Sequence, residues 1–445
     1  MPAVRRPPPS WPSRLRVAGS DPLVPMMVVA VGVGTLAAAA VELFRRAMLA
    51  LVALYSGQLH LEAAAAALPL AQRWLIPLLA ALAAGLLMGL GQRRFGRRPG
   101  PEYMEAVRVG DGRLPLRANL LRTMASLLAV SGGITIGREG TMIQFAAVMS
   151  GQIGRWPGFD AAQRRLIVAC GAAAGFAAAY HAPIAGSLFV AEVILGGLQL
   201  REIAAVLVAA VVGELTTQSL SAAGPLYLAQ TVGVVGWSDL FDSVLLGVLS
   251  GLLGPALLWL LDSSRRLLQS RLSWPPLRLA LAGLVIGLLS LLRPEVWGNG
   301  YSLVQSMLIQ PWALGALGLV LLLRLLALTA ASAAGIPGGV LTPTLALGAG
   351  VGLAVSQLLL LPAASHASVL WALVGMASLL AATTHAPAMS AILVFEMTRN
   401  YNAVLAAMPA SVLASVLASL LRPRSVYAEA LGLGDEAEAG AGAGR

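Results

Sequence analysis

One glutamate stands in the setting that most directly suggests chemistry. Glu139 belongs to the motif Gly137-Arg138-Glu139-Gly140, between two apolar stretches that are expected to be helices. The glycines allow unusual backbone angles and close approach of a ligand. A carboxylate at a helix start is held ionised by the N-terminal end of the helix dipole. Glu139 can therefore occupy an anion site as a tethered competitor that protonation releases; the alternative interpretation is an N-terminal capping acid.

A second glycine-rich break precedes another apolar stretch. It reads Gly335-Ile336-Pro337-Gly338-Gly339-Val340-Leu341-Thr342-Pro343. Backbone amides at a helix start have no intrahelical partner, so those of Val340 and Leu341 are free to hold an anion without a full positive charge. Such binding suits a permeating ion, which must bind and also leave.

The two breaks belong to an internal repeat. His181-Ala182-Pro183 is followed by Glu192, nine residues after the proline, and His385-Ala386-Pro387 is followed by Glu396 at the same spacing. Two homologous halves joined near residues 221–239 explain this pattern. Duplicated halves with short, glycine- and proline-interrupted membrane segments are typical of transporters, whose broken helices point at a site near the membrane midplane. The pattern leaves open whether the repeats are parallel or inverted.

The repeated acids and histidines have less specific roles. As intramembrane acids, Glu192 and Glu396 are candidate functional groups. Their equivalent places in the repeat favour a structural role instead, in which they satisfy backbone amides. His181 and His385 lack the spacing and the accompanying cysteines of a metal site, so neither a metal nor a cofactor is expected. The glycine-rich runs lack the lysine of a phosphate-binding loop.

Composition places these motifs in a membrane. Of the 445 residues, 58% are hydrophobic and only 11% are charged, whereas roughly a quarter are charged in ordinary soluble proteins. Apolar stretches approach the length of about 20 residues with which a helix crosses a bilayer. They include Met26–Ala40, Trp74–Leu90, Leu245–Leu261, Leu279–Leu292 and Leu314–Leu328. These stretches predict an all-α integral membrane protein surrounded by lipid.

The charge distribution predicts the topology. The net charge of +10 is compatible with a nucleic-acid partner. The arginines, however, gather before the first apolar segment and again between Arg93 and Arg122, two apolar segments later. Two crossings between two basic regions place both in the cytoplasm. We therefore expect no nucleic-acid partner and a multi-pass protein of a bacterial inner membrane with both termini cytoplasmic.

The chain is expected to contain one membrane domain between two tails. Residues 1–22 form a predicted disordered N-terminal tail, and residues 432–445 a short flexible C-terminal tail. The membrane domain, residues 23–431, divides into halves at about 23–220 and 240–431.

Several motifs together resemble the ClC family of chloride channels and proton/chloride exchangers. They are Gly137-Arg138-Glu139-Gly140, the break at 335–343 and Tyr427 just after the last helix. The segments 103–106 (YMEA), 297–302 (WGNGYS) and 384–387 (THAP) look closest to the bacterial ClcB branch. The resemblance extends over nearly the whole chain. It implies a ClC-type fold with two inverted, related halves of tilted and partly spanning helices, and a homodimer with one anion pathway per subunit.

The resemblance also assigns roles to residues. Glu139 falls on the family's gating glutamate, which relays protons in the exchangers, and Tyr427 on the tyrosine whose hydroxyl contacts the central anion. Leu341 replaces the usual phenylalanine. The anion-binding residues implied in this way are Gly137, Arg138, Gly140, Gly339, Val340, Leu341 and Tyr427.

Two positions depart from the family pattern. The Gly-Ser-Gly-Ile-Pro motif falls near Arg97–Pro101, where Arg98 takes the place of the anion-binding serine and Pro99, Gly100 and Pro101 form the candidate inner-site region. Val193 occupies the position of the intracellular proton-transfer glutamate of exchangers, beside Glu192.

The resemblance thus implies transport of chloride-like anions, by a voltage-gated-type channel or a proton/chloride antiporter with Glu139 as its gate. A proton-independent channel of the same fold is the alternative. An intramembrane acid–base enzyme, using Glu139 with His181 or His385, is less well supported, because the chain has no nucleophile–base motif and no metal-binding set.

Overall fold

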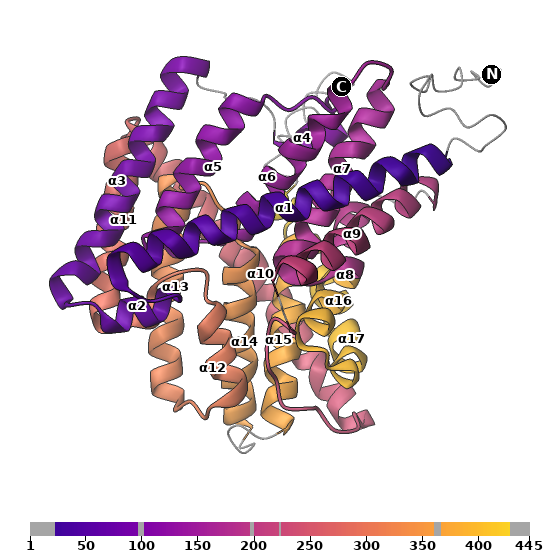
Figure 1. Cartoon of the computed structure of the whole chain (residues 1–445). Coiled ribbons are helices and arrows are strands. Elements are labelled where there is room, and N and C mark those ends of the chain that lie inside the picture. The colour runs from indigo at the N-terminus through magenta and orange to yellow at the C-terminus, as the bar shows by residue number, and fades with distance from the viewer. Residues whose placement is uncertain (1–22, 97–101, 196–199, 222–223, 360–365, 428–445) are drawn as a thin grey trace, which may run out of the picture.

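The computed structural model describes residues 23–96, 102–195, 200–221, 224–359 and 366–427. The two predicted tails and the candidate inner-site region at 97–101 lie outside the described residues. The described regular structure consists of helices and one isolated β-bridge (Figure 1). In this part of the chain, eight helical segments are long and apolar enough to cross a membrane. The predicted all-α membrane architecture is confirmed.

The first half of the chain consists of helices of unequal length. They are α1 (Leu23–Ser56), α2 (Leu61–Ala67), α3 (Leu70–Phe95), α4 (Tyr103–Arg108), α5 (Leu116–Ser131), α6 (Glu139–Gly151), η2 (Ile153–Arg155), α7 (Ala161–Tyr180), α8 (Pro183–Phe189), the π-helix η3 (Val190–Leu195) and α9 (Leu200–Leu220).

The second half repeats this arrangement. Its helices are α10 (Trp237–Arg271), α11 (Pro275–Leu292), η4 (Pro294–Val296), α12 (Tyr301–Ile309), α13 (Leu314–Ala334), α14 (Leu341–Leu358), α15 (His366–Thr384), α16 (Pro387–Thr398) and α17 (Tyr401–Leu421).

Glycines let the helices approach closely. Where α14 packs on α15, a Cβ added to Gly348 would overlap the carbonyl oxygen of Gly375, and a Cβ added to Gly375 would overlap that of Gly348. Such contacts are typical of membrane helices, whose association depends on tight packing and not on the hydrophobic effect. Close packing of the helices therefore explains why glycine and alanine are abundant in the sequence.

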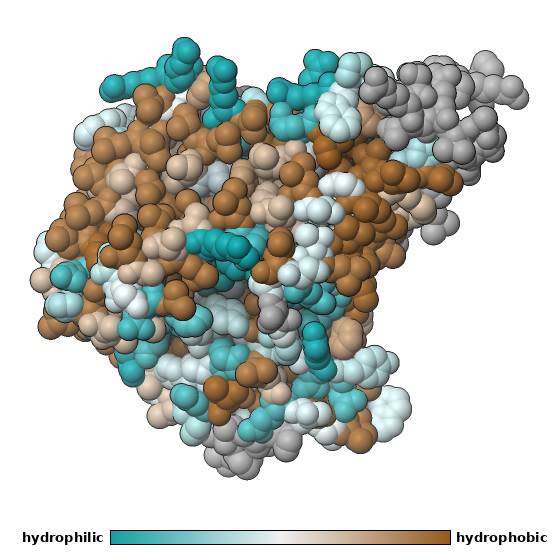
Figure 2. Space-filling model, viewed as in Figure 1, coloured by the Kyte–Doolittle hydropathy of each residue, from teal (hydrophilic) through white to brown (hydrophobic). Residues whose placement is uncertain are grey.

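The surface agrees with a membrane environment. α1 runs obliquely across the face seen in Figure 1, and hydrophobic residues cover the flanks over α1, α3 and α9 in Figure 2. Hydrophilic residues gather at the upper edge of this face and also lie at its centre and over its lower half. The exposed side chains of α3 and α10 include Leu79, Leu86, Leu252 and Trp259.

The repeat is visible in the backbone. α7 ends at His181, which has a left-handed conformation with φ 55°, and α15 is followed by His385 with φ 56°. Each histidine is followed by an alanine and then by a proline, Pro183 or Pro387, which begins the next helix. Proline suits this first helical position because its fixed φ matches the helix and its missing N–H would have no partner there.

The repeated glutamates join the two halves. The carboxylate of Glu192 accepts hydrogen bonds from two backbone amides at the start of α16, at 3.3 and 2.9 Å. Glu396, on α16, accepts two from amides at the start of α8, at 3.0 and 2.7 Å. This exchange of helix caps relates the halves by a pseudo-twofold axis. The antiparallel bridge described below is likewise shared equally by the two halves.

Glu396→Gln is expected to destabilise the protein. The substitution replaces one acceptor oxygen by an NH2 group that faces a backbone N–H, so a charge-assisted bond is lost and a buried amide is left unpaired. We expect the free energy of unfolding to fall by about 1–3 kcal/mol, measured as a lower thermal midpoint in detergent. Glu105→Gln, at an exposed acid in the first turn of α4, is the control. Equal midpoints for both variants would contradict the capping role.

Candidate anion site

The two glycine-rich breaks meet at the centre of the molecule. The amide of Gly137 donates to the carbonyl oxygen of Gly339 at 2.8 Å, and the amide of Gly339 donates to that of Gly137 at 2.7 Å. The pair forms an antiparallel bridge. α6 begins at Glu139 and α14 at Leu341, each two residues after its bridging glycine. The bridge therefore brings the N-termini of helices from opposite halves together.

These helix starts carry free amide groups. The first N–H groups of a helix have no intrahelical acceptor. In the described part of the chain, the amides of Glu139 and Gly140 in α6, and of Leu341 and Thr342 in α14, have no other acceptor. The positive ends of two helix dipoles thus converge. This is an arrangement that can bind an anion without a full positive charge.

Glu139 lies at this convergence. Its side chain is only 6% exposed. One carboxylate oxygen, Oε1, accepts a short hydrogen bond from Nδ2 of Asn299 and lies 3.5 Å from Nε of Arg138. The other oxygen, Oε2, is buried and has no hydrogen-bond partner among the described residues. The carboxylate is thus held through Oε1 only.

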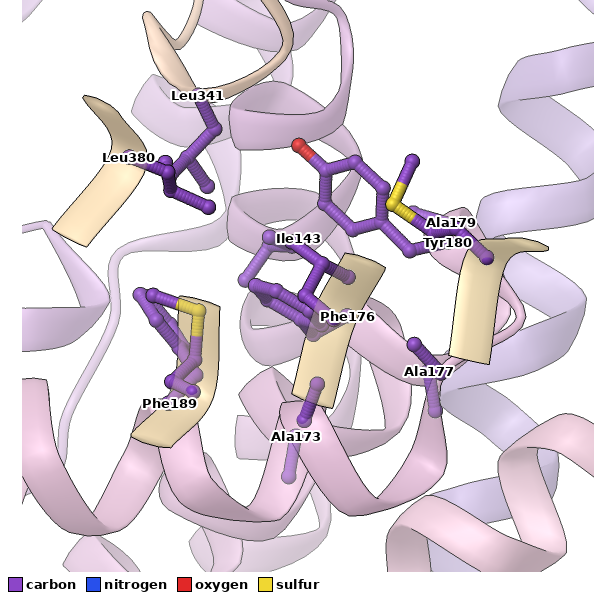
Figure 3. Packing of buried hydrophobic residues seen from close by; sticks show 14 of the residues in the cluster. Ile143, Ala173, Phe176, Ala177, Ala179, Tyr180, Phe189, Leu341 and Leu380 are labelled. Atoms are coloured by element: carbon purple, nitrogen blue, oxygen red, sulfur yellow. The ribbon is translucent and has the colours of Figure 1, made fainter. Parts of the chain in front are cut away.

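Aromatic rings connect the start of α14 to the end of α17. The Tyr180 hydroxyl lies 3.0 Å from Oγ1 of Thr342. From Tyr180 the ring centroids follow at 4.7 Å to Phe176, 4.9 Å from Phe176 to Phe189, and 5.5 Å from Phe189 to Tyr427. Figure 3 shows the first three of these rings, with the Tyr180 hydroxyl directed toward the side on which Leu341 lies. Tyr427 is partly buried and packs against the same hydrophobic core that contains Leu341 at the start of α14.

An arginine cluster adds positive charge near Glu139. Arg45, on α1, donates to the carbonyl oxygen of Ala178 at 2.8 Å and pairs with Glu42 at 3.2 Å. Arg46 pairs with the other oxygen of Glu42 at 2.7 Å. Arg45 is close enough to act electrostatically on Glu139. The polar residues that interrupt the first apolar stretch thus form an ion-pair network in which the buried Glu42 pairs with the partly buried Arg45 and the exposed Arg46.

The predicted site residues fall into two groups. Glu139 and both glycine breaks lie together, and Tyr427 is connected to them through the rings. Glu192 and Glu396 are engaged at the starts of α16 and α8. His181 pairs with a carboxylate of α9 at 3.2 Å. Among the described residues, no group of three or more His, Cys, Asp or Glu side chains is placed to hold a metal ion.

Two residues of this site have no role in the sequence interpretation. Asn299 belongs to the segment 297–302, which the sequence analysis uses only as part of the family resemblance and not as part of the site. The sequence feature that could have indicated Asn299 is its place as a polar residue between two glycines. Gly298 and Gly300 have φ of +73° and +98°. Tyr180 is the aromatic residue that ends an alanine-rich helix directly before His181.

The chain was compared with known proteins. A family model described as voltage-gated chloride channel matches residues 79–419. The voltage-gated ClC-type chloride channel ClcB of Salmonella typhimurium is 42% identical over 410 residues, which cover 90% of this chain and 97% of the relative. ClcB of an Escherichia coli strain is 43% identical over 411 residues, with the same coverage.

Solved structures show the same fold. A slow cyanobacterial Cl⁻/H⁺ antiporter is 24% identical with a TM-score of 0.79, covering 93% of this chain and 98% of that one. A CLC-type fluoride/proton antiporter is 23% identical with a TM-score of 0.72, covering 91% and 97%.

Proposed function

This chain belongs to the family of voltage-gated ClC chloride channels, and on that premise we propose that it transports chloride through a site between α6 and α14 that Glu139 controls. The pair of hydrogen bonds between Gly137 and Gly339 carries the proposal, because it brings two helix N-termini to one point. Gly140, Val340 and Leu341 supply further backbone at these helix starts, and Arg138 adds a side-chain charge.

The geometry supports gating by competition. An ionised Glu139 is attracted to the same free amides that attract chloride, so the two exclude each other. Protonation removes the charge, and with it the attraction to the helix dipoles. The neutral side chain then leaves the amides to the anion. Since these amides carry only partial charge, a chloride ion that binds there can also leave.

The transport mode depends on the path of the proton. In an exchanger, Glu139 delivers its proton to the opposite side, and Val193 cannot accept it because valine has no titratable group. In a channel, Glu139 opens the pathway and no proton crosses with the anion. The partly buried Glu192 beside Val193 accepts hydrogen bonds from the amides at the start of α16. We therefore propose a structural role for Glu192 and no role in proton transfer.

The reversal voltage of reconstituted protein tests the proposal and assigns the mode. Purified protein is placed in liposomes with a pH gradient and equal chloride on both sides. A reversal voltage that shifts with the pH gradient identifies proton/chloride exchange. A value at the chloride equilibrium voltage identifies a channel. Absence of any chloride-dependent current or flux would overturn the proposal and return the enzyme alternative to consideration.

Tyr427→Ala is expected to weaken chloride binding. Removing the ring opens the packing against Phe189 and deletes the hydroxyl that we assign to the anion. A hydrogen bond to a charged group stabilises by about 1.5–3 kcal/mol, so the dissociation constant from titration calorimetry should rise about tenfold or more. Tyr401→Ala, at a tyrosine that is 67% exposed, should bind chloride as the parent protein does. Unchanged affinity in Tyr427→Ala would remove Tyr427 from the site.

We further propose a homodimer with one pathway per subunit. It would lie in a bacterial inner membrane with both termini in the cytoplasm, and residues 23–220 and 240–431 would be its inverted halves. The arginines at the end of α3 support this orientation, because cytoplasmic loops are enriched in positive charge. The mass of the detergent-solubilised protein tests the oligomer, and a monomer in lipid nanodiscs would contradict it.

A further inference from the structure

Asn299 is the only side chain in the described residues that donates a hydrogen bond to Glu139. Asn299 lies between η4 and α12 and is only 6% exposed. Its other amide atom, Oδ1, accepts from the backbone N–H of Tyr301 at 3.3 Å. Because that acceptor position is occupied, the NH2 group is the part of the side chain directed at Glu139. The orientation of the amide is thereby fixed by the start of α12.

The segment that carries Asn299 is anchored from two sides. Arg324, a buried arginine of α13, donates to the carbonyl oxygens of Glu295 at 2.6 Å and Gly298 at 3.1 Å. Two residues of the first half hold the same segment. The carbonyl oxygen of Gly133 accepts from the amide of Gly298 at 3.1 Å, and the Thr135 hydroxyl donates to the carbonyl oxygen of Val296 at 2.6 Å. Asn299 is therefore attached to a rigid frame, whereas Glu139 has an unpartnered second oxygen.

We propose that Asn299 is a positioning residue that holds the ionised Glu139 in place and thereby sets the pH at which chloride transport is activated. This inference rests on the proposed gating role of Glu139. An amide N–H stabilises a carboxylate that accepts its hydrogen bond, and it favours the ionised form over the protonated form. Loss of this donor makes protonation easier, so the gate opens at higher pH.

The side chains that directly face Glu139 are arginines and tyrosines. They are Arg138 at the N-cap of α6, Arg45 on α1, Tyr180 on α7, Tyr227 before α10 and, beside Arg138, Tyr301 on α12. Ordinary arginine and tyrosine side chains keep their charge state between about pH 4 and 8. Glu42 and the Glu214–His181 pair lie near Arg45.

The test is the pH dependence of chloride efflux from liposomes. Asn299→Asp is nearly isosteric and keeps the acceptor for the Tyr301 amide, but it replaces the donor by a second carboxylate. We expect half-maximal efflux to move upward by more than one pH unit. Asn299→Ala removes the donor without adding a charge, although it also removes the acceptor for the Tyr301 amide. Its midpoint should rise by about one pH unit, a tenfold change in the protonation equilibrium. Asn400→Ala is the matched control, since this buried asparagine donates to Gln230, outside the site.

A double variant separates positioning from a merely structural role. In the Glu139→Gln background, Asn299→Ala should change neither the efflux rate nor its pH dependence, because the Glu139 carboxylate on which Asn299 acts is absent. Midpoints equal to the parent value in both single variants would overturn the inference and leave the gating proposal intact. A pH dependence that survives in Glu139→Gln alone would instead contradict the gating proposal itself.

Discussion

Glu139→Gln is expected to leave chloride efflux from liposomes intact while removing its dependence on pH. Glutamine has the shape of the protonated acid, so it cannot compete with chloride for the free amides of α6 and α14. We expect efflux near neutral pH to rise at least about tenfold over the parent protein, which corresponds to about 1.4 kcal/mol of lost competition. Any proton movement coupled to chloride in the parent protein should disappear.

The matched control for this variant is Glu396→Gln. It also neutralises a partly buried acid, but this carboxylate is bound to the amides at the start of α8. It should lower stability and keep the pH dependence of transport. If Glu139→Gln retained the parent pH profile, another titrating group would have to be the gate.

Gly137→Ala is expected to abolish most of the transport by separating the two helix starts. A Cβ at this position would lie 2.7 Å from the carbonyl oxygen of Gly339 and 3.2 Å from Oε2 of Glu139. The backbone of α14 would have to move away, because a carbonyl oxygen cannot rotate aside as a side chain can. With the bridge broken, chloride affinity should fall at least about tenfold, measured by titration calorimetry and by efflux.

Gly318→Ala is the control for this substitution. Gly318 is exposed on α13, and a Cβ added there would meet no atom within 4 Å. The control should fold and transport as the parent protein does. If Gly137→Ala bound chloride with the affinity of the parent protein, chloride binding would not depend on the hydrogen bonds between Gly137 and Gly339.

The main features of the fold could be predicted from the sequence because they leave local signals. The apolar stretches identify the membrane helices, and the two His-Ala-Pro triplets with their following glutamates identify the repeat. The positions of α6 and α14 follow from glycine-rich breaks, since glycine is used where two backbones approach closely. These signals depend on neighbours within about a dozen residues of one another.

The contacts of Glu139 could not be predicted in the same way. Asn299 is 160 positions away in the chain and meets Glu139 only because Arg324 and Thr135 hold the segment before α12. Arg324 itself looks like an interruption of an apolar helix. Its role is visible only when its carbonyl partners at Glu295 and Gly298 are known. A buried polar residue is determined by its partners, and these are set by the tertiary structure.

The central claim is that this chain transports chloride under the control of Glu139. The most direct measurement is chloride efflux from liposomes that contain the purified wild-type protein, recorded at acidic and at neutral pH. We predict that these vesicles lose chloride faster than protein-free vesicles and that the loss is faster at acidic pH, where Glu139 is protonated. Retention of chloride for as long as in protein-free vesicles at both pH values would contradict the account.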